Sequence, residues 1–148
     1  MREGKKVVAV SGGFDPLHIG HLDHIRKAKK LGDILVAIVN SDGQLIAKKG
    51  YCFLPLSQRL EIVKDIRYVD EVVVSMDEDG TCAETLQEIK PDIFAKGGDR
   101  TPDNMPESEI KVCGDIGCQI IYGVGDQLDS SQDIIRRVVT RLQGVKYD

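Results

Sequence analysis

The chain has 148 residues, of which 41% are hydrophobic and 30% charged, and its formal net charge is −4. This length fits one domain with its own core, taken here as residues 1–148, and the apolar fraction excludes a disordered chain. The acidic balance argues against a nucleic-acid partner, and no apolar run approaches the ~20 residues that a membrane helix needs. The start of the chain shows no signal-peptide core, and the four cysteines show no metal or disulfide pattern. We therefore expect a soluble, cytoplasmic protein with reduced thiols and no membrane partner.

Short β-rich runs alternate with amphipathic helical stretches along the chain. In order, the patterns predict strand 7–10, helix 21–31, strand 34–39, helix 56–66, strand 69–74, helix 82–89, strand 91–95, helix 107–116, strand 119–122 and helix 131–142. This alternation predicts an α/β fold in which helices cover both faces of a parallel sheet. With right-handed crossovers, the result is a single-domain, Rossmann-like, doubly wound parallel sheet of about five strands.

Ligands of such a sheet bind at the carboxyl ends of the strands, where the strand order reverses. The segments that follow the predicted strands are 11–21, 40–50, 75–80, 96–106 and 123–131. The first, fourth and fifth are rich in glycine and polar residues, so we expect the site to form there.

The first of these segments reads Gly-Gly-Phe-Asp-Pro-Leu-His-Ile-Gly-His over residues 12–21. Two glycines after a strand let backbone N–H groups approach an anion, and the helix that follows favours negative charge at its N-terminus. His18 and His21 lie about one helical turn apart, with Gly20 between them, which is typical of a phosphate clamp. A metal site built with His24, or an ordinary strand–helix turn, is the alternative; we expect His24 to be a surface or packing residue.

This ten-residue run resembles the signature of the HxGH-motif nucleotidyltransferase superfamily, in its cytidylyltransferase-like branch. That group includes heptose-1-phosphate adenylyltransferases and glycerol-3-phosphate cytidylyltransferases. The resemblance implies a transferase that moves a nucleoside monophosphate from a nucleoside triphosphate to a phosphorylated sugar or polyol and releases pyrophosphate. It also implies Mg²⁺ on the triphosphate, with no protein metal ligand assigned, and a homodimer in which residues 66–74 lie either at the interface or in the core.

The resemblance implies roles for particular residues. The catalytic residues would be His18, His21 and Lys48, with Lys49 as the neighbouring candidate. The nucleotide-binding residues would be Gly12, Gly13, Phe14, Asp15, Gly20, Lys96, Gly97, Gly98, Asp99, Ser130 and Ser131. Asp15 would orient a ligand or the water shell of the metal. Gln58-Arg59 also resembles the family, in which this region lies near the subunit interface or supports the site. Each of these assignments has an ordinary alternative: two lysines before a glycine are typical of a solvated loop, Ser130 of an N-cap, and Arg59 of a plain helix surface.

The nucleotide and the acceptor are less well defined. The Lys-Gly-Gly-Asp run at 96–99 resembles the heptose-phosphate enzymes, and residues 124–127 lack an arginine that glycerol-phosphate enzymes carry. Both features favour ATP and a sugar phosphate over CTP and a polyol phosphate, which remains the alternative. Asp129 fits neither pattern. A second alternative, from another class, is a regulatory module that binds a nucleotide without turnover.

Overall fold

Five parallel strands and six helices make up the part of the chain that the computed structural model describes, residues 2–144. In chain order they are β1 (Val7–Gly12), α1 (Ile19–Lys29), β2 (Ile34–Val39), α2 (Asp42–Lys49), α3 (Leu56–Lys64), β3 (Glu71–Val74), α4 (Ala83–Ile89), β4 (Ile93–Ala95), α5 (Glu107–Ile116), β5 (Gln119–Ile121) and α6 (Ser131–Gly144). The predicted α/β class and the five-stranded parallel sheet are confirmed.

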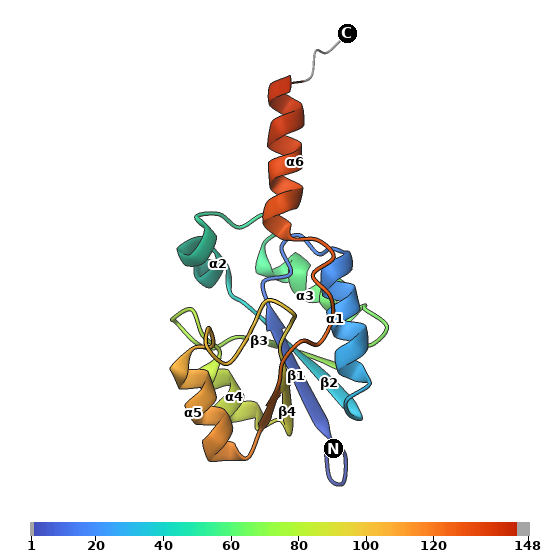
Figure 1. Ribbon diagram of the computed structural model, residues 1–148, viewed down its shortest axis with the longest axis vertical. Coiled ribbons are helices and arrows are strands. Elements are labelled where there is room, and N and C mark those ends of the chain that lie inside the picture. Colours follow the sequence, from blue (N-terminus) through green and yellow to red (C-terminus); the bar gives the residue numbers. More distant parts are fainter. Residues whose placement is uncertain (1, 145–148) are drawn as a thin grey trace.

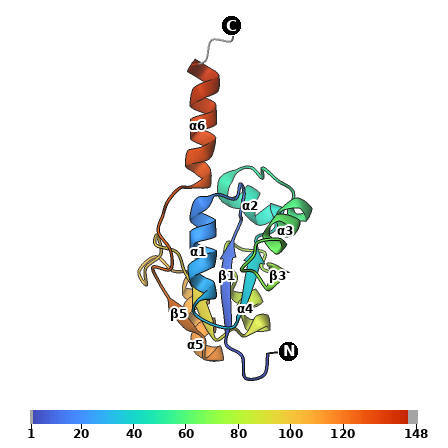
Figure 2. The same cartoon turned by 90° about the vertical axis from the view of Figure 1, so that its right-hand side faces the viewer.

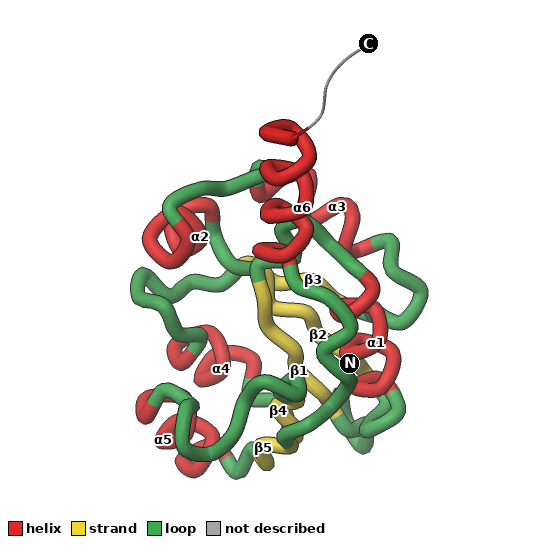
Figure 3. Tube along the Cα trace, turned by 45° about the horizontal axis from the view of Figure 1, so that its top comes forward, coloured by secondary structure: helices red, strands yellow, loops and turns green. Residues whose placement is uncertain are grey.

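The sheet has the order β3-β2-β1-β4-β5 and separates two hydrophobic clusters. Alternate residues of a strand point to opposite faces. Accordingly, Val8 of β1 packs with Ile25 of α1 and Val63 of α3, whereas its neighbour Ala9 packs with Leu86 of α4 in the other cluster. Figure 3 shows α1 and α3 on one side of the strands and α4 and α5 on the other. This is the doubly wound arrangement that the sequence predicts.

The strand order reverses beside β1, and the pairing there leaves a gap. Along β2, pairing continues to Gly12, which lies opposite Val39. Along β4, pairing stops at Ala9, which lies opposite Phe94. The last residues of β1 therefore have no strand neighbour on the β4 side. This is the switch point at which open α/β sheets bind their ligands.

Helix α2 was not predicted, because the lysine pair and glycine at its end look like a loop. Its N-terminus is a capping box in which the Ser41 hydroxyl accepts from the Gln44 N–H and the Gln44 side chain accepts from the Ser41 N–H. Its C-terminus is Gly50 in the left-handed conformation, with φ of 85°. Both are recognised helix-end signals. Helix α1 also begins earlier than predicted, at Ile19, so that His18 becomes its N-cap.

Helix α6 rises from the carboxyl edge of the sheet and projects along the long axis of the molecule (Figures 1 and 2). Its first turn is attached to the loop after β1, because the Ser131 hydroxyl donates to the Pro16 carbonyl at 3.0 Å. Farther along, Val138, Val139 and Leu142 are exposed. None of the described helices is long and apolar enough to cross a bilayer.

Candidate active site

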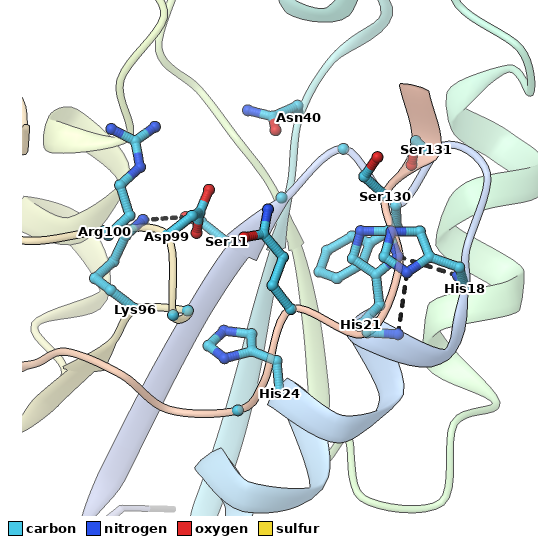
Figure 4. A pocket seen from close by; sticks show the side chains of 18 of the residues that line it. Ser11, His18, His21, His24, Asn40, Lys96, Asp99, Arg100, Ser130 and Ser131 are labelled. Atoms are coloured by element: carbon cyan, nitrogen blue, oxygen red, sulfur yellow. Dashed lines mark hydrogen bonds between the residues drawn. The ribbon is translucent and has the colours of Figure 1, made fainter. Parts of the chain in front are cut away.

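A cleft of about 430 Å³ opens at the carboxyl edge of the sheet, beside the unpaired end of β1. This volume lies in the ~300–1,000 Å³ range of small-molecule sites. The loops after β1, β4 and β5 meet there, as predicted (Figure 4). Thirteen of the fourteen predicted site residues border the cleft: Gly12, Gly13, Phe14, His18, Gly20, His21, Lys48, Lys96, Gly97, Gly98, Asp99, Ser130 and Ser131. The exception is Asp15.

His18 and His21 form a stacked pair at the start of α1, with ring centroids 3.8 Å apart. Nδ1 of His18 accepts from the Gly20 N–H at 3.0 Å, and Nδ1 of His21 accepts from the His18 N–H at 3.2 Å. A nitrogen that accepts a hydrogen bond carries no proton, so the proton of each neutral ring lies on Nε2. The backbone thus fixes one tautomer in both rings, with Nε2–H as the remaining donor.

Both imidazoles are neutral near pH 7. Burial, together with the charges of His18, His24 and Lys49, lowers the pKa of His21 to about 3. Burial also lowers the pKa of His18, although the Asp129 carboxylate opposes this shift. The Asp129 carboxylate is held in turn by the Arg137 guanidinium, at 3.0 and 3.2 Å. Asp129, which fits neither family pattern, therefore lies close enough to His18 for its charge to act on that ring.

Two small features keep the histidine pair in place. A Cβ on Gly20 would lie 2.9 Å from the His18 ring and 3.3 Å from the Asp129 carbonyl oxygen, so any side chain at this position would displace the His18 ring. The Phe14 ring is buried against His21, with centroids 5.2 Å apart. Phe14 therefore supports the pair from within the loop.

His24 joins α1 to the loop after β5. Its Nδ1–H donates to the Val124 carbonyl, and burial lowers the pKa of the ring. The loop comes so close that a Cβ on Gly125, where φ is +98°, would lie 2.8 Å from the His24 Cα. His24 borders the cleft but packs rather than joining the stacked pair. Among the described residues, no three His, Cys, Asp or Glu side chains are grouped as metal ligands.

The start of α6 forms the wall beside the histidines. The Ser130 hydroxyl accepts from the Asp133 N–H at 3.0 Å, which is the ordinary N-cap interaction. The first N–H groups of a helix have no partner within the helix, so the N-terminus of α6 attracts anions. Two helix N-termini, of α1 and α6, therefore border the same cleft.

The two lysines of α2 differ in their surroundings. Lys48 borders the cleft with an exposed side chain, whereas Lys49 is half-buried. The Lys49 ammonium donates to the Asp15 carbonyl oxygen at 3.2 Å. Burial lowers the pKa of Lys49, and the Asp15 carboxylate opposes this shift. Of the two cations, Lys49 is the one held against the histidine loop.

Asp15 does not reach the cleft, contrary to the role expected from the sequence. Its carboxylate is fully buried and accepts from the backbone N–H groups of Phe53 and Leu54 at 2.6 and 2.7 Å. Both oxygens are used in holding the segment after α2. Asp15 therefore stabilises the loop after β1, and its carboxylate does not border the cleft.

Arg59 is also fully buried, which rules out a plain helix-surface residue and leaves the supporting role that the family resemblance implies. Its guanidinium donates to the carbonyls of Leu54, Gly13 and Asn40 at 2.9, 3.0 and 2.6 Å, and to the Asp42 carboxylate at 2.6 Å. One side chain thereby ties the loop after β1 to the ends of β2 and α2. It supports the site without bordering the cleft.

The Lys-Gly-Gly-Asp run leaves the sheet at the end of β4. The Lys96 ammonium donates to the Ser11 hydroxyl at 3.5 Å (Figure 4). The same ammonium lies 4.5 Å from the centre of the Phe94 ring. Burial lowers the pKa of Lys96, and the Glu109 carboxylate opposes this shift. Gly98 lies close to the loop after β5: a Cβ there would be 3.1 Å from the Gly125 carbonyl oxygen.

Several residues that border the cleft were not predicted: Ser11, Asn40, Gln44, Thr81, Cys82 and Glu109. Glu109 is the clearest case. It lies inside a helix whose pattern is that of any amphipathic helix, and only the packing of α5 brings it to the cleft. No signal in the sequence distinguishes it from its neighbour Glu107, which is exposed.

Comparison with known proteins finds a matching family model and similar sequences. The family model described as cytidylyltransferase-like matches residues 9–137. The bifunctional protein HldE of Syntrophotalea carbinolica is 34% identical over 152 residues, which cover 96% of this chain and 29% of that protein. HldE of Citrobacter koseri is 41% identical over 110 residues, covering 73% and 23%. The chain thus spans less than a third of the length of these relatives.

A solved structure is also similar in both fold and sequence. It is the lipopolysaccharide core biosynthesis protein of Thermoplasma volcanium, with a TM-score of 0.70 and 28% identity. The match covers 85% of this chain and 100% of that chain.

Proposed function

Because this chain belongs to the cytidylyltransferase-like family, we propose that it is a nucleotidyltransferase. It would move a nucleoside monophosphate from a nucleoside triphosphate to a phosphorylated sugar and release pyrophosphate. The observation that carries this proposal is the stacked His18–His21 pair, which presents two Nε2–H donors between the N-termini of α1 and α6.

In this reaction a phosphate oxygen of the acceptor attacks the α-phosphorus in line and the bond from that phosphorus to the bridging oxygen breaks. The second pKa of a phosphate monoester is ~6, so the nucleophile is already an anion and needs no general base. Catalysis then depends on positioning and on donors to the growing negative charge. His18 and His21 would donate to the α- and β-phosphates from Nε2.

A lysine would add positive charge at the α-phosphate or the acceptor phosphate. The family resemblance indicates Lys48, but Lys49 is the half-buried cation whose charge acts on both histidines. We therefore assign this role to Lys49, with Lys48 at the rim.

The nucleotide would lie between the loop after β1 and the loop after β4. Gly12, Gly13 and Gly20 let the backbone approach the phosphates, and Gly97, Gly98 and Asp99 border the opposite wall. Ser130 and Ser131, at the N-terminus of α6, would hold the leaving pyrophosphate. Mg²⁺ would arrive with the triphosphate, whose charge it neutralises; among residues 2–144 no cluster of ligands is built for it.

ATP and a sugar phosphate are favoured as substrates. The Lys96–Asp99 run resembles heptose-1-phosphate adenylyltransferases, and the chain is similar to the HldE proteins and to a protein of lipopolysaccharide core biosynthesis. Thermal unfolding with Mg²⁺ and each of ATP, CTP, GTP and UTP tests the donor. A ligand at about 100 times its Kd adds about 2.7 kcal/mol to the unfolding free energy. Stabilisation by CTP alone would favour a polyol-phosphate cytidylyltransferase instead.

Release of pyrophosphate from ATP on addition of a heptose 1-phosphate tests the reaction itself. A regulatory module would show nucleotide-dependent stabilisation and no pyrophosphate with either a heptose 1-phosphate or glycerol 3-phosphate. A module without turnover would not need the two fixed Nε2–H donors of His18 and His21. We favour the enzyme because both donors are present.

We also propose that the protein is a cytoplasmic homodimer. All four cysteines are free thiols, as suits a reducing compartment. The apolar residues Ile66, Val69 and Val72 pack on the core, so the exposed stripe of Val138 and Leu142 on α6 is the better candidate interface. Light scattering of the wild type and of Leu142→Glu tests this: the wild type should have twice the mass of one chain and the variant the mass of one.

A further inference from the structure

Glu109 has a carboxylate oxygen that is buried without a partner. The side chain is on the first turn of α5 and is only 4% exposed. Its Oε2 accepts from the Cys82 N–H at 3.1 Å, where α4 begins. Its Oε1 is the one buried side-chain nitrogen or oxygen in residues 2–144 that has no hydrogen-bond partner. Buried polar groups are nearly always paired, and an unpaired one is costly.

Lys96 provides a matching donor in the same cleft. Its ammonium makes one long hydrogen bond, to Ser11 at 3.5 Å, and lies over the Phe94 ring. It makes no hydrogen bond to Glu109 Oε1. A largely buried cation and a buried carboxylate oxygen therefore border one cleft while neither satisfies the other. Such a pair suits a ligand group that donates and accepts at once, as a sugar hydroxyl does.

The position of this pair indicates which substrate it meets. Glu109 and Cys82 belong to the α4–α5 side of the sheet, whereas the histidines and Ser130 lie on the side of α1 and α6. In an in-line displacement the nucleophile approaches opposite the leaving group. With pyrophosphate leaving towards the N-terminus of α6, the acceptor enters from the α4–α5 side.

We propose that Glu109 and Lys96 bind the hydroxyl groups of the sugar-phosphate acceptor, the carboxylate accepting from a hydroxyl and the ammonium donating to one. This inference rests on the proposed function, and it moves Lys96 from the nucleotide to the acceptor. It also gives the acceptor a chemical requirement: at least two hydroxyls within reach of the pair. A site with buried polar groups of this kind rejects analogues that cannot pair with them.

The test uses Glu109→Gln in the full chain, with Glu107→Gln as the matched control. Glutamine keeps an oxygen for the Cys82 N–H and replaces the free acceptor with a donor. Glu107 is on the same turn and exposed. With ATP as donor, Glu109→Gln should raise the KM for a heptose 1-phosphate at least about tenfold and leave the ATP-induced thermal shift unchanged. Lys96→Met should do the same, and Glu107→Gln should behave as wild type.

An unchanged KM for the acceptor, or a lost ATP-induced shift in a folded Glu109→Gln protein, would overturn the inference. Calorimetric titration of the heptose 1-phosphate into each protein separates this result from failure of the proposed reaction. If the wild type releases no pyrophosphate but binds the sugar phosphate in a Glu109-dependent way, the inference about Glu109 and Lys96 is supported and the proposed reaction is contradicted. If the wild type does not bind the sugar phosphate, Glu109 and Lys96 do not form a sugar-phosphate site, and the inference is wrong.

Discussion

The backbone N–H of His18 donates to Nδ1 of His21 at 3.2 Å, while Nδ1 of His18 accepts from the Gly20 N–H. These two bonds form the capping box of α1, so the residues proposed to contact phosphate are also the residues that begin the helix. One consequence is that both rings expose Nε2–H. The other is that removal of either ring affects the helix start as well as the chemistry.

Replacement of His18 separates the two roles. His18→Ala removes both the donor and the N-cap and should lower turnover roughly 10²-fold or more, with a stability loss of about 1 kcal/mol. His18→Asn keeps an oxygen that can cap α1 but lacks Nε2–H, so its stability should be near wild type and its turnover as low as that of alanine. Measurement of kcat and of the unfolding midpoint checks both. Near-normal turnover in either folded variant would contradict the proposed clamp.

A methyl group on Gly20 tests the geometry of the clamp. Gly20→Ala places a Cβ 2.9 Å from the His18 ring, which must move. Because a displacement of about 1 Å in a catalytic group can cost 10²-fold, we expect kcat to fall by about ten- to a hundredfold. Gly43→Ala in α2 is the control, since the nearest atom to its Cβ would be 3.9 Å away. Equal activities of the two variants would show that the position of His18 is not critical.

The two lysines of α2 are distinguished by neutral replacements. Lys49→Met removes the half-buried cation beside the histidines and should lower kcat at least about tenfold. Lys48→Met removes an exposed charge and should leave kcat within about threefold of wild type. Steady-state kinetics on the pair, with melting curves as the folding control, decides which lysine acts. The opposite ranking would return the role to Lys48, as the family resemblance indicates.

Arg59 should be a stability residue. Arg59→Lys cannot reproduce a fork that bonds three carbonyls and the Asp42 carboxylate, so buried acceptors lose their partner. We expect a loss of about 2–4 kcal/mol in the unfolding free energy, measured by urea denaturation. Arg67→Lys, on an exposed position, should change it by less than about 0.5 kcal/mol. An Arg59→Lys protein as stable as wild type would show that these hydrogen bonds contribute little to the unfolding free energy.

The neutral histidines predict a dependence of stability on acid. His21 has a pKa of about 3 in the folded protein against 6.5 in an unfolded chain, because of burial and of the charges of His18, His24 and Lys49. Between those values the unfolded chain binds the proton that the folded one excludes. The contribution of neutral His21 to the unfolding free energy is therefore fully present above pH 6.5 and is lost progressively as the pH falls towards 3.

His21→Asn removes this titration and should flatten the slope of unfolding free energy against pH between 6.5 and 4, relative to wild type. Urea denaturation at several pH values measures the slope. The same slope in the variant and the wild type would mean that other groups govern the acid response.

Much of the fold could be predicted because its signals are local. The apolar runs of β1 and β2 and the periodic helices between strands need only neighbouring residues to be recognised, and they determine the α/β class. The glycine and histidine spacing of residues 12–21 is equally local, and the structure brings His18 and His21 together as expected. Helix α2 was missed although Ser41, Gln44 and Gly50 carry its end signals, because the lysines obscured them.

The sequence by itself determined the fold class, the edge of the sheet that holds the site, and the pairing of the two histidines. Only the tertiary structure decided that Asp15 and Arg59 are buried supports, that Lys49 rather than Lys48 lies against the loop, and that Glu109 reaches the cleft. The physical reason is distance along the chain. Periodicity and capping act over a few residues, whereas Lys96 meets Ser11 across 85 residues and Ser131 meets Pro16 across 115, and such contacts exist only once the sheet has formed.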